Sequence, residues 1–116
     1  MYALHRAYPD ITQITLPKPG MAPLFGTPAN VYLFHGDAPA LLGTGHAVCA
    51  DALDAALAQL GLRRNDIERV LALDWSPDQL GAADAFPDAD VLVAAAHTDR
   101  VADYAGFLRH ERAEFD

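Results

Sequence analysis

The sequence predicts an α/β domain with a mixed β-sheet, in which an antiparallel hairpin is followed by the order β-α-β-α-β-α. Up to residue 42, β-branched and aromatic runs are separated by Pro- and Gly-rich turns. From Asp51 the apolar spacing becomes helical, and short apolar runs then alternate with helix-like segments. With 116 residues the chain is expected to be a single domain, residues 1–116.

The predicted hairpin lies in the N-terminal part of the chain. Residues 11–16 are assigned to a strand on β-propensity, and residues 21–28 to a Pro- and Gly-rich loop. Strands are expected at 30–35 and 40–42, joined by a turn at 36–39. This spacing is typical of two strands that pair with each other.

An amphipathic helix is predicted to begin after Asp51, which is a suitable N-cap residue. Apolar residues recur at intervals of three and four, at Leu53, Ala56, Leu57 and Leu60. Gly61 stands where a left-handed residue usually ends a helix.

The rest of the chain alternates strands and helices. A turn at 65–68 is expected to place Ile67 inward. In the last helix Val101, Tyr104 and Leu108 share one stripe, and the charged tail 109–116 is expected to fray. The expected elements are a strand at 69–73, a helix at 79–85, a strand at 90–94 and a helix at 97–108.

The charge composition argues against binding to nucleic acid or to an anionic membrane. Sixteen Asp and Glu residues outnumber eight Lys and Arg residues, which gives a formal charge of −8. Phosphate binding depends on clustered basic side chains, and this chain has only one Lys. A single cysteine, Cys49, excludes an internal disulfide and a Cys-based zinc cluster, and it is expected to be a small buried apolar residue. No segment resembles a signal peptide or a membrane span, so a cytoplasmic location is expected.

Several strings resemble the N-terminal half of the metallo-β-lactamase fold. Residues 30–34 resemble an early strand of that family, residues 41–45 its strand-ending Asp-Thr-Gly, and residues 61–67 its helix exit. Residues 70–83 resemble the segment in which a strand ends in Thr-His-x-His-x-Asp-His. The resemblance implies one half of an αββα sandwich, with the remaining metal ligands beyond residue 116.

The metal-binding motif of the resembled family is degenerate in this chain. Asp74, Ser76 and Gln79 stand in the positions of its three histidines, while Asp78 keeps the Asp. Gly43 replaces the Asp of Asp-Thr-Gly. We therefore predict a non-catalytic module and assign no catalytic or cofactor-binding residue.

The substituted residues suit the start of a helix. Ser76 would be the N-cap, Pro77 the first helical residue, and Gln79 the third residue of a Ser-x-x-Gln capping box. This predicts that the Ser76 hydroxyl accepts a hydrogen bond from the backbone amide of Gln79.

A metal site remains an alternative. His46, Asp74, Asp78 and His97 follow predicted elements that end at the same edge of the sheet, so they are the candidate ligands for zinc or iron. These metals prefer imidazole, however, and two Asp without a neighbouring His-x-His pair make a poor set. The corresponding function is a metal-dependent hydrolase or oxidoreductase whose site another chain completes.

Trp75 is the only Trp and lies in a polar segment. Its ring either covers that loop and the Ala-rich helix or anchors a protein interface, a role in which Trp is enriched. A small-ligand pocket beside Trp75 is a third hypothesis for function.

Apolar residues on both sides of the strands predict a sheet with two apolar faces. The predicted helices can cover one face, so the other needs a partner. A second copy of the chain, a different polypeptide with the complementary half-domain, or a removed C-terminal half would each supply it. The opposed sets are Val31 and Leu33 against Tyr32 and Phe34, Val70 and Ala72 against Leu71 and Leu73, and Val91 and Val93 against Leu92.

Overall fold

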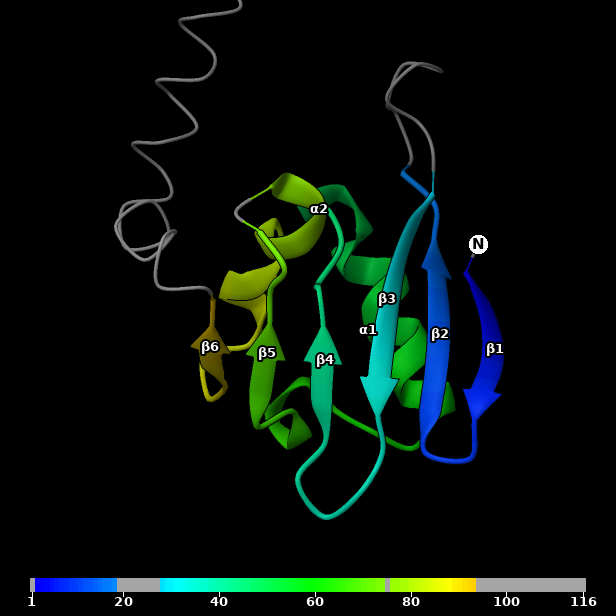
Figure 1. The fold of residues 1–116 in the computed structure, drawn as a ribbon. Coiled ribbons are helices and arrows are strands. Elements are labelled where there is room, and N and C mark those ends of the chain that lie inside the picture. The colour runs from blue at the N-terminus through cyan, green and yellow to red at the C-terminus, as the bar shows by residue number, and fades with distance from the viewer. Residues whose placement is uncertain (1, 19–27, 75, 94–116) are drawn as a thin grey trace, which may run out of the picture.

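The computed structural model describes residues 2–18, 28–74 and 76–93. These residues form one six-stranded mixed sheet in which every strand lies beside its neighbours in sequence (Figure 1). The first four strands pair antiparallel and the last three pair parallel, so the predicted mixed sheet is confirmed. The strands are β1 (Ala3–Tyr8), β2 (Ile11–Leu16), β3 (Ala29–Phe34), β4 (Ala40–Leu42), β5 (Arg69–Leu71) and β6 (Asp90–Leu92).

The helices lie in the crossovers between the parallel strands. The connection from β4 to β5 contains η1 (Ala47–Cys49), α1 (Ala50–Gln59) and η2 (Arg64–Asp66), and that from β5 to β6 contains α2 (Pro77–Leu80) and η3 (Ala83–Ala85). Figure 1 shows α1 behind the sheet and the opposite face toward the viewer. The predicted helix at 97–108 and the tail at 109–116 lie outside the described residues. No helix in the described part is long and apolar enough to cross a membrane.

Strand β1 is absent from the sequence prediction. It pairs antiparallel with β2 along its length, with a register shift between Arg6 and Tyr8. Its side chains are almost all exposed, so the strand lacks the alternation of buried and exposed residues that marks a half-buried strand. The prediction therefore had no periodic signal to follow here.

Helix α1 begins at Ala50, two residues earlier than predicted, and the predicted N-cap at Asp51 is wrong. The short helix η1 runs directly into α1, and Asp51 lies in the first turn of α1. The side chain of His46 instead caps η1, because its Nδ1 accepts a hydrogen bond from the Val48 amide at 3.2 Å.

The predicted end of α1 is confirmed. Gly61 has a φ of +82°, its amide bonds to the Ala58 carbonyl at 3.0 Å, and the Leu62 amide bonds to the Leu57 carbonyl at 2.8 Å. These two bonds form a Schellman motif, which satisfies the last carbonyls of the helix.

The second predicted helix, at 79–85, is split into α2 and η3. The loop after β4 forms hydrogen bonds with backbone groups that a continuous helix would use for its own hydrogen bonds. The Gly45 amide bonds to the Asp78 carbonyl at 3.0 Å. The Thr44 amide bonds to the Gln79 carbonyl at 2.9 Å, and the Ala82 amide bonds to the Thr44 hydroxyl at 3.0 Å. Tertiary hydrogen bonds thus end α2 after one turn.

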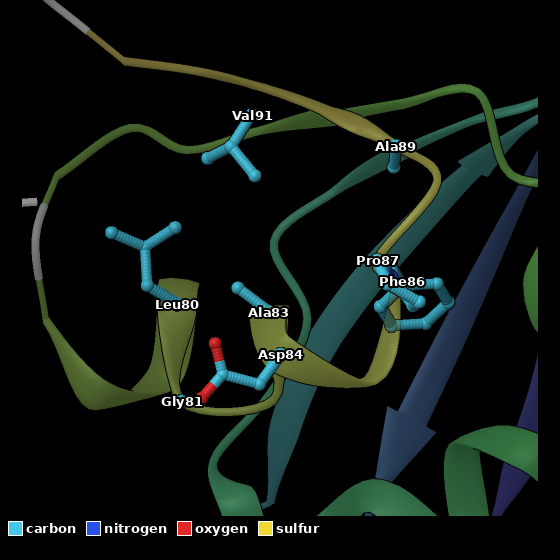
Figure 2. Close-up of a pocket in the computed structure, with 8 residues that line it drawn as sticks. All are labelled: Leu80, Gly81, Ala83, Asp84, Phe86, Pro87, Ala89 and Val91. Carbon is cyan, nitrogen blue, oxygen red and sulfur yellow. The ribbon is translucent and has the colours of Figure 1, made fainter. Parts of the chain in front are cut away.

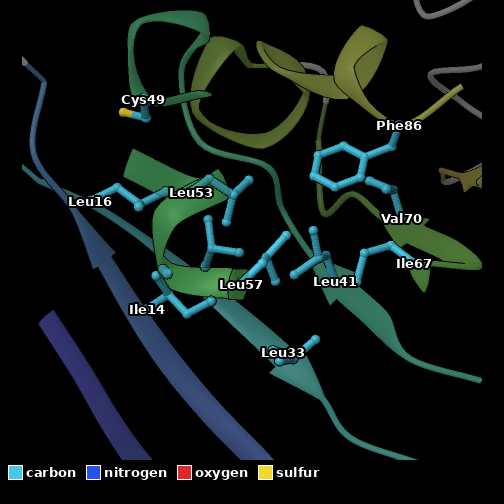
Figure 3. Close-up of a cluster of buried hydrophobic side chains, with 12 residues drawn as sticks. Ile14, Leu16, Leu33, Leu41, Cys49, Leu53, Leu57, Ile67, Val70 and Phe86 are labelled. Atoms are coloured by element: carbon cyan, nitrogen blue, oxygen red, sulfur yellow. The ribbon is translucent and has the colours of Figure 1, made fainter. Parts of the chain in front are cut away.

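The core lies between the sheet and α1 (Figure 3). Ile67 is fully buried in it, as predicted. Thr12 is the polar residue on the inward side of β2, and its hydroxyl lies 2.7 Å from Nε2 of His35. The inward side chains include Ile14, Leu16, Val31, Leu33, Leu41, Leu53, Leu57 and Val70.

Candidate functional site

Two loops meet at the edge of the sheet where β4 and β5 end. The Gly43 amide bonds to the Leu71 carbonyl at 2.7 Å, which extends the pairing of β4 with β5 by one residue. Beyond that point the β4 loop bonds to the backbone of Asp78 and Gln79, as described above. The structure therefore places Asp78 and Gln79 at the predicted edge, because parallel strands bring their carboxyl ends together.

Thr44 is the polar residue at the centre of this edge. It is fully buried, and its hydroxyl donates to the Gly45 carbonyl at 3.0 Å or the Gln79 carbonyl at 3.2 Å while accepting from the Ala82 amide. The Gly-Thr-Gly string of the sequence is thus a structural connection between the β4 loop and the β5 crossover.

Asp78 is held by Lys18, the single lysine of the chain, which follows β2. The Lys18 ammonium lies 2.8 Å from Oδ1 and 3.0 Å from Oδ2 of Asp78. The Lys18 side chain is 7% exposed, whereas that of Asp78 is 50% exposed. The sequence analysis did not predict this pair. The signal that could have indicated it is that the chain has one lysine and sixteen acidic residues.

The predicted capping box at Ser76 is wrong. Ser76 occupies the N-cap position, but its side chain makes no capping bond. Its own amide donates to Oδ1 of Asp74 at 2.7 Å, and the Gln79 side chain turns to the Leu73 amide at 3.0 Å instead. Asp readily bonds the amide two residues ahead, and this local turn replaces the reciprocal pair expected for a capping box.

The described residues do not form a zinc or iron centre by themselves. Asp78 is paired with Lys18, Asp74 accepts from Ser76, and His46 accepts from Val48 through Nδ1. Within the described ranges, no three His, Cys, Asp or Glu side chains come close enough to share a metal ion. His97, the fourth candidate, lies outside those ranges, as does Trp75.

Cys49 lies beneath the same edge as a buried thiol. Burial raises the pKa of the Cys49 thiol, and Sγ donates to the Pro17 carbonyl at 3.2 Å. The nucleophilic form of cysteine is the thiolate, so this arrangement keeps Cys49 in its unreactive form at neutral pH.

Solved structures of metallo-β-lactamases are similar to this chain. A metallo-β-lactamase from Hirschia baltica superposes with a TM-score of 0.67 and 19% identity, over 90% of this chain and 48% of that one. A metallo-β-lactamase from Cronobacter sakazakii gives 0.66 and 17%, over 84% and 36%. A metallo-β-lactamase family protein from Thermus thermophilus gives 0.58 and 29%, over 72% and 28%. The chain has a metallo-β-lactamase-like fold.

The chain spans less than half the length of each of these structures. No protein-family model matches its sequence, and no curated protein matches it significantly. The fold predicted from short strings is therefore confirmed by three-dimensional similarity.

The metallo-β-lactamase-like sheet has one face without a helix among the described residues. Strand register aligns a row of side chains on this face, Gln13, Tyr32, Leu42, Leu71 and Leu92. Tyr32, Leu42 and Leu71 are half-buried, and Leu92 is 47% exposed. A second row contains Ile11, Phe34, Ala40, Arg69 and Asp90. We call this surface the open face, and its central strands are apolar, as the sequence predicts.

Proposed function

We propose that the chain is a non-catalytic interaction module that self-associates through the open face of its metallo-β-lactamase-like sheet. The observation that carries the proposal is the row Tyr32, Leu42, Leu71 and Leu92, which is apolar and partly exposed. A sheet with two apolar faces needs cover on both, and α1 covers only the other one.

The charges on the strand rows of the open face are compatible with a second copy as the partner. Each chain carries a formal charge of −8, which opposes association of two copies. On the strand rows of the open face, however, the acidic Asp90 stands in register with the basic Arg69, so these two charges offset each other. Two such faces can meet around a twofold axis and form a helix-sheet-sheet-helix arrangement.

A substitution in the centre of the open face tests this proposal. We expect Leu42→Lys to convert a dimer into a monomer in light scattering, because the new ammonium would be buried at the interface without a partner. Ala58→Lys is the matched control, since Ala58 is exposed on α1 on the other side of the sheet.

Circular dichroism separates dissociation from unfolding. A folded Leu42→Lys protein that is still a dimer would contradict the use of this face, and a monomeric wild type would contradict self-association. In the latter case a chain with the complementary half-domain becomes the expected partner.

The cytoplasmic location stays a prediction.

A metal-dependent hydrolase completed by another chain is the second candidate. One observation favours it: the Cronobacter sakazakii metallo-β-lactamase is described by a HARLDQ motif, and the string Asp74–Gln79 ends in the same Asp-Gln. The test combines metal analysis of protein purified without chelator with assays on ester, lactam and thioester substrates. A metal-to-chain ratio near one together with turnover would favour this candidate over the interaction module.

A further inference from the structure

A hollow of about 380 Å³ lies between α2, η3 and β6 (Figure 2). The residues that line it all belong to the described part of the chain. Its walls are mainly apolar, and Asp84 supplies a carboxylate. The apolar lining includes Leu80, Ala83, Phe86, Ala89 and Val91.

The hollow is on the opposite side of the sheet from the open face. Val91 stands in register with Val70 and therefore points to the helix-covered side. Val70 is fully buried there, whereas Val91 is 38% exposed. In the described part of the chain, the layer of helices that covers β5 thus ends before it covers β6.

The size and lining of the hollow suit a small molecule. Sites for small ligands are usually concave, enclose about 300–1,000 Å³ and combine apolar walls with a few polar groups. Leu80 and Phe86 are each only 3% exposed, so these parts of the wall are held in place by their packing. The exposed carboxylate of Asp84 is the charged group of the lining.

The charge of this region favours a cation. Residues 70–93 contain five Asp and no Lys, Arg or His. Asp78 is paired with Lys18, but no ion pair joins Asp84 to another side chain within the described ranges. A ligand with a positive group would therefore meet a carboxylate that is free to pair with it.

We propose that the hollow binds a small organic cation, namely a primary amine with an apolar body. Its ammonium group pairs with Asp84, and its apolar part fills the space between Leu80 and Val91. A second copy of the chain suits this place poorly, because it would bring a formal charge of −8 to an acidic wall. The site lies away from the open face, so amine binding does not depend on the self-association proposed above.

Three probes that share a phenyl group separate the effect of charge from that of apolar burial. They are 2-phenylethylamine, 2-phenylethanol and phenylacetate, which are a cation, a neutral molecule and an anion at pH 7. Each is titrated into the full chain, and the methyl NMR signals of Val91 and Leu92 are followed. We expect the amine to bind roughly tenfold more tightly than the alcohol, because a hydrogen bond to a charged group forms. Phenylacetate should bind more weakly than the alcohol.

Two pairs of residues give matched controls. Val91 lines the hollow and Leu92 points to the open face, so the amine should shift the signals of Val91 and leave those of Leu92 unchanged. Asp84 and Asp88 are both exposed, but Asp88 does not line the hollow. Asp84→Asn should reduce the affinity for the amine to that for the alcohol, whereas Asp88→Asn should change it by less than about twofold.

The other outcomes overturn the inference. Equal affinity for the three probes, or an unchanged affinity for the amine in Asp84→Asn, would show that Asp84 does not select a cation. Shifts at Leu92 without shifts at Val91 would place the binding on the open face. Binding of none of the probes would show that the hollow is not a site for a small amine. Both Asp substitutions change exposed side chains, so the variants are expected to fold.

Discussion

The hydroxyl of Thr44 offers a sharp test of how the sheet edge is held together. Thr44→Val keeps the shape of the side chain and removes the hydroxyl that accepts a hydrogen bond from the Ala82 amide. Ala82 is only 4% exposed, so its amide would be left buried without a partner. Leaving a buried donor without a partner costs about 1–3 kcal/mol. Because Val fills the same space, no cavity adds to this loss, and we expect about 2 kcal/mol of destabilisation.

Urea unfolding followed by circular dichroism measures the effect. With a dependence on urea of about 1–3 kcal/mol per molar, a loss of this size lowers the midpoint by roughly 1 M. Thr44→Ser is the control, because it keeps the hydroxyl and loses only a methyl group, worth about 1 kcal/mol. A Thr44→Val protein as stable as the wild type would refute the view that this hydroxyl joins the β4 loop to the β5 crossover.

Three further predictions concern the same edge. Gly81→Ala should lower the free energy of unfolding by about 1–3 kcal/mol, because the added Cβ would lie 2.7 Å from the Ala47 amide nitrogen; an unchanged melting temperature would contradict that contact. Asp74→Ala should cost about 1 kcal/mol in urea unfolding, whereas Ser76→Ala should change stability by less than about 0.5 kcal/mol; the reverse order would restore the Ser76 cap. Burial raises the pKa of Cys49, so stability should fall as the pH rises above about 8.5, where the unfolded thiol ionises first. A Cys49→Ala protein with the same alkaline pH dependence as the wild type would contradict this linkage.

Local periodicity was sufficient to predict part of the fold. Helix α1 has apolar residues at helical spacing and a glycine at its end, and both features depend only on residues close together in sequence. Strand β2 has the predicted bounds for a similar reason, since its β-branched residues favour an extended backbone. Strand β1 has mostly exposed side chains, so it exists because β2 offers it hydrogen bonds and not because of its own pattern.

Contacts between distant residues decided the parts that the sequence did not predict. The end of α2 depends on Thr44, which is 38 residues from Ala82. The partner of Asp78 is Lys18, 60 residues away. At Ser76 the capping pattern was present, but Asp74 formed a competing local bond. In each case the residue type was compatible with the prediction, and tertiary or competing hydrogen bonds selected another structure.

The mass of the wild-type protein in solution tests the central claim most directly. Light scattering at micromolar concentration should give twice the 12.5 kDa of one chain, because the open face is expected to be covered by a second copy. A mass of 12.5 kDa over the whole concentration range would contradict self-association through the sheet.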